Sequence, residues 1–210
     1  YRLIMSEYGY IPQAPTQSWG SNKGIFTPND IYDLTRDDKF TEYGQLDLIE
    51  TQSVSSVSQV DFTNLGTYNV HFLTSSSIES STTNVRYSVR FYESGVLETA
   101  SVYKYAYQQC LVGSNAEFND TANSSIPIQI EQPTGFLGGG YTYFYNLIDS
   151  TKYSFLTNQH NRISDSMIAE FGSGVMPQAS SVTGIQIRAY DSSLATFNGS
   201  FSLYGIKAYE

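Results

Sequence analysis

The chain has 210 residues, of which 20 are acidic and 11 basic, so its formal net charge at neutral pH is −9. Nucleic-acid binding relies on basic patches that displace counterions from phosphates, so this charge excludes nucleic acid as an expected partner. No stretch approaches the roughly 18 consecutive apolar residues of a membrane-spanning helix, so insertion into a membrane is not expected either.

The aromatic content favours strands. The chain holds 18 tyrosines and 12 phenylalanines, and aromatic residues suit the half-buried surface of a pleated sheet. Cys110 is the only cysteine, which excludes an intramolecular disulfide and a thiolate metal site. Stability is therefore expected from core packing, from association of several copies, or from both.

The N-terminal region predicts an extended arm. Residues 6–24 contain prolines and glycines and show little periodicity. Trp19, the only tryptophan, lies in this arm, where it either folds back onto its own domain or anchors the arm in a neighbouring subunit. Ile25 and Phe26 follow and extend the predicted attachment segment.

A short helix is expected next. Thr27 is suited to cap its N-terminus, Pro28 to occupy its first position, and Asp30 to interact with its positive end. Ile31 and Leu34 supply a narrow apolar stripe, which we expect to dock the arm on the partner to which it attaches. Residues 1–44 are thus predicted to be an arm with one short helix.

From residue 45 onward the pattern has a period of two. In the stretch from residue 85 to residue 91, apolar side chains alternate with arginine and serine, which is typical of a half-buried strand. A hairpin is expected from 141–147 and 153–157, an exposed loop over 110–125, and a turn at 138–140. Eight to ten short strands at this spacing predict an all-β domain over 45–210, a jelly-roll-like antiparallel β-sandwich.

Two strands carry tyrosines at every second position. Each set stands on one side of its strand, where it either lines the core or a subunit contact, or forms a platform on which sugar rings stack. The two sets are Tyr103, Tyr105 and Tyr107, and Tyr141, Tyr143 and Tyr145.

The sequence offers little for catalysis. His71 is expected to point away from Val70 and Phe72, toward solvent if those two face the core, and His160 is expected in a polar loop. Neither has the spacing of a metal site, and no nucleophile elbow occurs. The acidic segment 115–120 is interpreted as a hydrated loop without the calcium-binding pattern. We expect no enzymatic activity, no cofactor and no metal.

Several segments carry a resemblance to a known family. The order of four segments resembles that in the jelly-roll-like modules of bacteriophage virion structural proteins. These segments are VDFTNLG at 60–66, residues 85–92, residues 101–106, and GSFSLYGI at 199–206. Residues 24–34 likewise resemble an N-terminal segment of such proteins, notably those of marine phages. The resemblance spans about residues 24–208 and supplies no catalytic residues.

The resemblance implies a non-enzymatic virion protein, a tail-fibre or capsid-decoration component on the particle surface. It also implies contacts with other virion proteins and with copies of the chain itself, in a homo-oligomer such as a trimer, because fibres and capsids repeat one contact many times. The alternative is an adhesin that binds a host-surface glycan, and a polysaccharide hydrolase is less expected.

Overall fold

The computed structural model describes residues 27–37, 46–82, 85–132, 134–163, 167–190 and 195–207. The predicted attachment residues Trp19, Ile25 and Phe26 lie outside these ranges. The chain divides into two compact units, Tyr1–Gln45 and Leu46–Glu210, each of which is described by itself.

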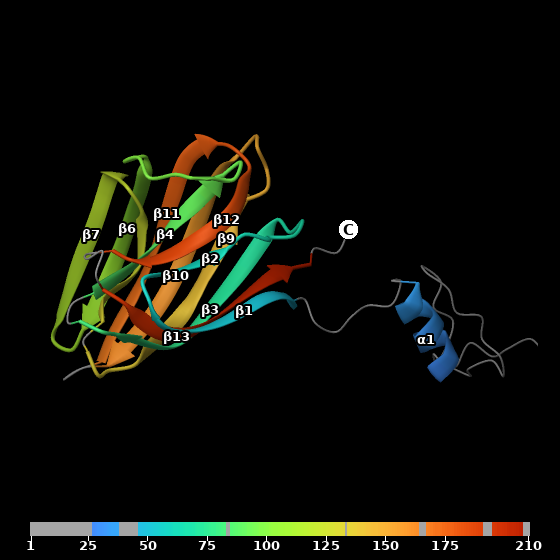
Figure 1. Cartoon of the computed structure of the whole chain (residues 1–210), viewed down its shortest axis with the longest axis horizontal. Helices are drawn as coiled ribbons and strands as arrows, with labels where there is room; N and C mark the ends of the chain where they lie inside the picture. The colour runs from blue at the N-terminus through green and yellow to red at the C-terminus, as the bar shows by residue number, and fades with distance from the viewer. Residues whose placement is uncertain are drawn as a thin grey trace, which may run out of the picture. The chain divides into compact units, whose positions relative to one another are not determined.

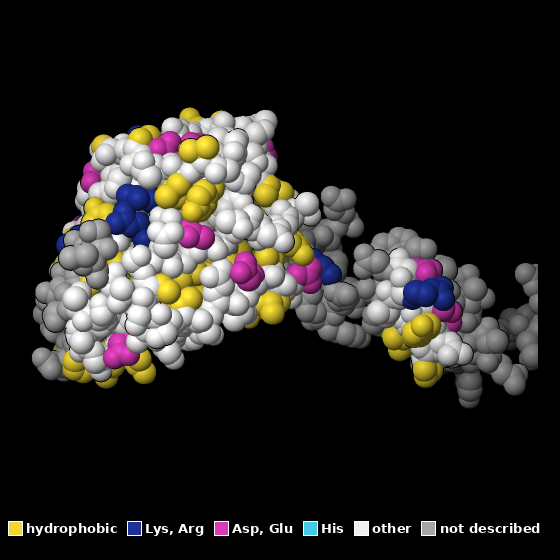
Figure 2. All heavy atoms as spheres, in the orientation of Figure 1, with side chains coloured by type: hydrophobic (Ala, Val, Ile, Leu, Met, Phe, Trp, Pro, Cys, Tyr) yellow, Lys and Arg dark blue, Asp and Glu magenta, His cyan; other side chains and the backbone are white. Residues whose placement is uncertain are grey.

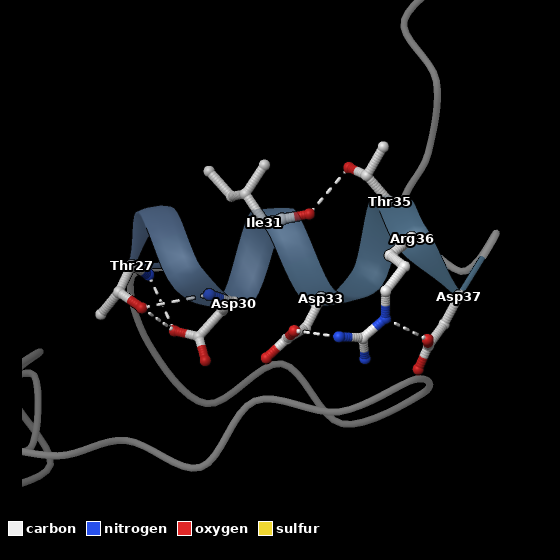
Figure 3. Close-up of polar contacts among 7 residues, drawn as sticks. All are labelled: Thr27, Asp30, Ile31, Asp33, Thr35, Arg36 and Asp37. Atoms are coloured by element: carbon white, nitrogen blue, oxygen red, sulfur yellow. Dashed lines mark hydrogen bonds and ion pairs between the residues drawn. The ribbon is translucent and has the colours of Figure 1, made fainter.

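The predicted helix forms as α1, Pro28–Arg36. The side chain of Thr27 accepts a hydrogen bond from the backbone N–H of Asp30, and the Asp30 carboxylate accepts one from the backbone N–H of Thr27, at 3.2 and 2.8 Å (Figure 3). This reciprocal pair satisfies two N–H groups that have no partner inside the helix. Arg36 pairs with Asp33 at 3.0 Å at the other end. The local sequence therefore determines where α1 begins.

The second unit is an antiparallel β-sandwich, as predicted, in which the chain repeatedly passes from one sheet to the other (Figure 1). The larger sheet has eight strands in the order β1-β13-β3-β9-β10-β11-β6-β7. They are β1 (Leu46–Val57), β13 (Phe197–Ile206), β3 (Val70–Ser80), β9 (Gly138–Tyr145), β10 (Tyr153–Ile163), β11 (Met167–Ala179), β6 (Tyr103–Leu111) and β7 (Ser114–Asn123).

The smaller sheet has five strands, in the order β2-β12-β4-β5, and β8 also pairs with β4. They are β2 (Gln59–Phe62), β12 (Val182–Ala189), β4 (Val85–Glu93), β5 (Val96–Leu97) and β8 (Ile126–Gln132). All pairings between the named strands are antiparallel, as predicted.

The core lies between the two sheets and is rich in aromatic side chains. Phe91 of the smaller sheet and Phe144 of the larger one meet edge to face, with ring centroids 6.1 Å apart. The hydroxyl of Tyr103 accepts a hydrogen bond from the Phe91 backbone N–H at 3.0 Å and donates one to the Glu98 carbonyl at 3.1 Å. A buried phenol therefore links the sheets while its polar atom stays satisfied.

Two segments expected to be irregular are strands. The predicted loop 110–125 contains all of β7, which pairs with β6 and forms an edge of the larger sheet. The loop was predicted from the polarity of this segment, but an edge strand can also carry polar residues along its whole length. The predicted turn at 138–140 begins β9. A Cβ atom on Gly140 would lie 2.2 Å from the Gln159 carbonyl oxygen, so glycine is required there by a close backbone approach.

Candidate functional site

The outer face of the larger sheet carries a cluster of aromatic side chains. The strand register places Phe72 of β3 directly opposite Tyr143 of β9 and Tyr204 of β13. Tyr141 and Tyr145 lie two residues to either side of Tyr143 and point the same way, because side chains alternate along a strand. We call these five residues the outer aromatic cluster.

The rings of the outer aromatic cluster touch one another. Phe72 lies in its middle, with ring centroids 4.7 Å from Tyr143, 5.9 Å from Tyr141 and 6.2 Å from Tyr204. Tyr143 and Tyr145 are stacked at 6.4 Å. Such tilted and stacked pairs hold the rings in fixed positions and make a continuous apolar surface.

Two hydroxyl groups of the cluster are held by neighbours on β10. Tyr141 donates a hydrogen bond to the side-chain oxygen of Gln159 at 2.8 Å, and the Tyr145 hydroxyl lies 3.3 Å from the Thr157 hydroxyl. Tyr141 is 37% exposed, and the other members are partly buried by each other. The cluster thus combines fixed ring faces with a polar rim, a composition typical of binding surfaces.

The outer face has further exposed aromatic residues beyond the cluster. Tyr153 and Phe155 on β10 and Phe171 on β11 are each between 41% and 48% exposed. Phe171 borders a groove of about 380 Å³ that is also lined by Ala106 and Glu117. Exposed aromatic surface of this kind favours association with a partner or ligand.

The second predicted tyrosine set faces the opposite way. Tyr103 and Tyr107 are buried on the inner face of the sheet, and Tyr105 packs against the core beside them. Tyr107 stacks on Tyr105 and on Phe118, with centroids 5.6 and 4.9 Å apart. The stacking prediction is therefore wrong for Tyr103, which belongs to the core, whereas Tyr107 is 8% exposed and borders the same groove as Phe171.

His71 points away from Val70 and Phe72, as predicted, but it faces the core and Phe72 does not. His71 is fully buried and its Nε2 lies 2.7 Å from the Leu65 carbonyl oxygen, whereas Phe72 points outward. Burial lowers the pKa of His71, and the hydrogen bond to Leu65 opposes that effect. The error arises because the outer face is itself apolar, so an apolar side chain does not identify the core side of β3.

His160 is not in a loop but in β10, where it points into the core. Burial lowers its pKa to about 3, so the imidazole is neutral at physiological pH. Its Nε2 lies 3.3 Å from the Thr142 hydroxyl. Glu170 stands opposite His160 in the register and accepts a hydrogen bond from Gln109 at 2.8 Å. Since these groups are buried between the sheets, we interpret them as a structural polar network.

The two described attachment candidates lie on α1. Ile31 is 39% exposed and Leu34 is partly buried, and no residue of the helix is buried. The i, i+3 spacing places them on the same side of α1. The apolar stripe predicted from the sequence is thus present on a folded element with an accessible surface.

The described residues show neither a metal-binding cluster nor a helix that could span a membrane. Within the described ranges, no group of three or more His, Cys, Asp or Glu side chains converges on a potential metal position. The segment 115–120 lies in β7, where successive side chains alternate between faces, rather than in a loop. In the same part of the chain, no helix has the length and apolar character needed to cross a membrane.

Comparisons with known proteins add no relative. No protein-family model matches the chain, and neither the curated proteins nor the solved structures contain a match to it.

Proposed function

We propose that this chain is a non-enzymatic structural component of a bacteriophage virion, a tail-fibre or capsid-decoration protein attached through residues 1–44. The observation that carries the proposal is α1, which is capped by its own sequence yet buries none of its nine residues. Helices this short are marginal in water without packing, so the Ile31 and Leu34 side is expected to be covered by a partner. Because the order of segments resembles that of virion proteins, we propose that this partner is another virion protein.

The sandwich fits a repeated structural role. Its outer aromatic cluster provides fixed apolar rings with polar edges, as interfaces do. A virion repeats one contact many times, so a single favourable surface acts at every copy. We place the chain on the particle surface, in contact with other virion proteins and with copies of itself.

The first experiment localises the chain. Purified phage particles are labelled with antibodies against the sandwich and imaged by cryo-electron microscopy. Hundreds of copies on the shell would identify a decoration protein, and a few copies at the tail would identify a fibre. Particles that lack the chain would refute the virion assignment.

The second experiment tests attachment through α1. Ile31→Asp and Leu34→Asp place a charge on the apolar stripe and should abolish incorporation into particles, because a buried carboxylate without a partner is costly. Asn29→Asp makes the same change of charge on the polar side of α1 and is the matched control. Equal incorporation of all three variants would contradict attachment through the stripe.

A second candidate function is a glycan-binding adhesin, and the exposed ring of Tyr141 favours it. Sugar rings stack on aromatic faces, and neighbouring hydroxyl groups hold their polar edges. Replacing Tyr141 and Tyr143 with alanine should then reduce adsorption to host cells without changing particle assembly. Tyr153→Ala, an exposed tyrosine of the same sheet outside the cluster, is the control. Loss of assembly instead of adsorption would assign the cluster to subunit contacts.

A further inference from the structure

A second candidate site lies on the outer face of the smaller sheet, away from the surfaces discussed so far. Arg90 on β4 stands opposite Gln186 on β12, and Arg188 on β12 stands opposite Gln59 on β2. These four side chains, together with Ser58, line a groove of about 310 Å³. Arg90 and Arg188 are diagonal neighbours across β4 and β12, so their Cβ atoms are separated by roughly 7–8 Å.

The two arginines have no carboxylate partner among the described residues. Arg90 donates from Nε to the Ser124 carbonyl at 2.9 Å and from Nη2 to the Ser124 hydroxyl at 3.3 Å. Arg188 donates from Nε to the Ala189 carbonyl at 3.1 Å. The remaining guanidinium N–H groups form no hydrogen bond within the described residues.

The placement of these charges is unfavourable without a ligand. Burial lowers the pKa of Arg90, and the neighbouring charge of Arg188 lowers it further. The chain as a whole carries a net charge of −9, so a groove with two neighbouring arginines differs in charge from the chain overall. Figure 2 shows dark blue Lys and Arg side chains at only a few places on the visible face of the sandwich, one of them a compact patch. A bound anion would relieve the repulsion and engage the remaining donors.

The groove also presents hydrogen-bond acceptors. The side-chain nitrogens of Gln59 and Gln186 donate to Asp61, at 2.7 and 3.0 Å. Asp61 accepts a third bond from the Tyr92 hydroxyl at 2.8 Å, so its charge is well satisfied. The side-chain oxygens of both glutamines form no hydrogen bond within the described residues. The hydrogen bond from each amide nitrogen to Asp61 fixes the side chain, so each oxygen remains available as an acceptor.

We propose that this groove binds an acidic saccharide. Arg90 and Arg188 would hold its carboxylate, and the oxygens of Gln59 and Gln186 would accept bonds from its hydroxyl groups. A bare inorganic anion would use the donors alone, whereas a sugar acid matches donors and acceptors together. The groove volume lies at the low end for small-molecule sites, which suits one or two sugar units. The site is independent of the virion assignment and of the outer aromatic cluster.

Calorimetric titration of the full chain tests the proposal with three probes. The first is a disaccharide that contains one glucuronic acid, the second is the same disaccharide with its carboxyl reduced to an alcohol, and the third is inorganic phosphate. We expect binding of the first probe and at least tenfold weaker binding of the other two, because a charge-assisted hydrogen bond contributes that much.

Variants separate the groove from general electrostatics. Arg188→Gln should weaken binding of the acidic disaccharide at least tenfold, and it leaves the Arg90 contacts with Ser124 in place. Lys104→Gln removes the same charge from an exposed position on the larger sheet and should bind like the original chain. An unchanged near-ultraviolet circular dichroism spectrum shows that each variant is folded.

Three results would overturn the proposal. Equal binding by the Arg188→Gln variant would exclude the groove, and equal binding of the reduced disaccharide would exclude recognition of the acid. Phosphate binding as tight as that of the acidic disaccharide would leave a simple anion site without saccharide recognition.

Discussion

Replacement of His160 should change how the stability of the sandwich depends on pH. In the folded chain, burial lowers the pKa of this imidazole from its ordinary 6.5 to about 3. Below pH 6.5 the unfolded chain therefore binds a proton that the folded chain does not. The contribution of the neutral His160 side chain to the unfolding free energy is therefore fully present above pH 6.5 and is lost as the pH falls toward 3.

The size of the effect follows from the two pKa values. When the pH falls from 8 to 4.5, stability is lost only below pH 6.5, over about two pH units. This loss amounts to roughly 3 kcal/mol of unfolding free energy. His160→Gln removes the titration and leaves an amide that can reach the Thr142 hydroxyl, the present hydrogen-bond partner of His160. The variant is expected to be less stable at pH 8 and to lose roughly 3 kcal/mol less on acidification.

Urea unfolding at both pH values, followed by tyrosine fluorescence, measures the difference between the original chain and the variant. Subtracting the two pH effects cancels the carboxylates common to both proteins. An identical loss of stability in the two proteins would refute the burial argument, because it would mean that His160 titrates alike in the folded and unfolded chains.

Three further changes have defined outcomes. His71→Gln should also reduce the loss of stability on acidification, since burial lowers the pKa of His71; an unchanged pH dependence would contradict this. Gly140→Ala should lower the unfolding free energy by at least about 2 kcal/mol, because the new Cβ would meet the Gln159 carbonyl oxygen at 2.2 Å; thermal unfolding of the chain measures it. Thr27→Ala should cost α1 about 1 kcal/mol and raise amide exchange there, while the melting temperature of the sandwich stays the same.

Features that depend on local chemistry could be predicted from the sequence. The start of α1 follows from Thr27 and Asp30, three residues apart, which interact without help from the rest of the chain. The strand now seen as β4 was identifiable because its polar and apolar residues alternate strictly. The hairpin of β9 and β10 was recognisable from two strand-like runs around a short polar turn.

The direction of side chains could not be predicted where both faces of a strand are apolar. Around His71 and Phe72 the hydrophobic pattern gives no preferred side, and the outward side proved to be the one with Phe72. The two tyrosine sets look alike in the sequence, yet Tyr103 faces the core and Tyr143 faces outward. Orientation was determined by sheet packing, which alternation alone does not encode.

The candidate sites depend on register in the same way. Tyr141, Tyr143 and Tyr145 could be grouped from their spacing, but Phe72 and Tyr204 join them only through pairing with distant strands. Arg90 and Arg188 were missed for that reason. Their one signal in the sequence is an arginine on the polar side of each of two predicted strands, and only the pairing of β4 with β12 brings them together.

The pairing of β1 with β13 has a consequence for biosynthesis. In the order β1-β13-β3, a strand that is made after every other strand of the sheet lies between two that were made much earlier. Until β13 emerges, β1 has no partner in its sheet and β3 has an unpaired edge. Unpaired strand edges can pair with other chains and so promote aggregation. The larger sheet is therefore completed only after β13 has been made, and we expect the nascent chain to depend on chaperones or slow translation until then.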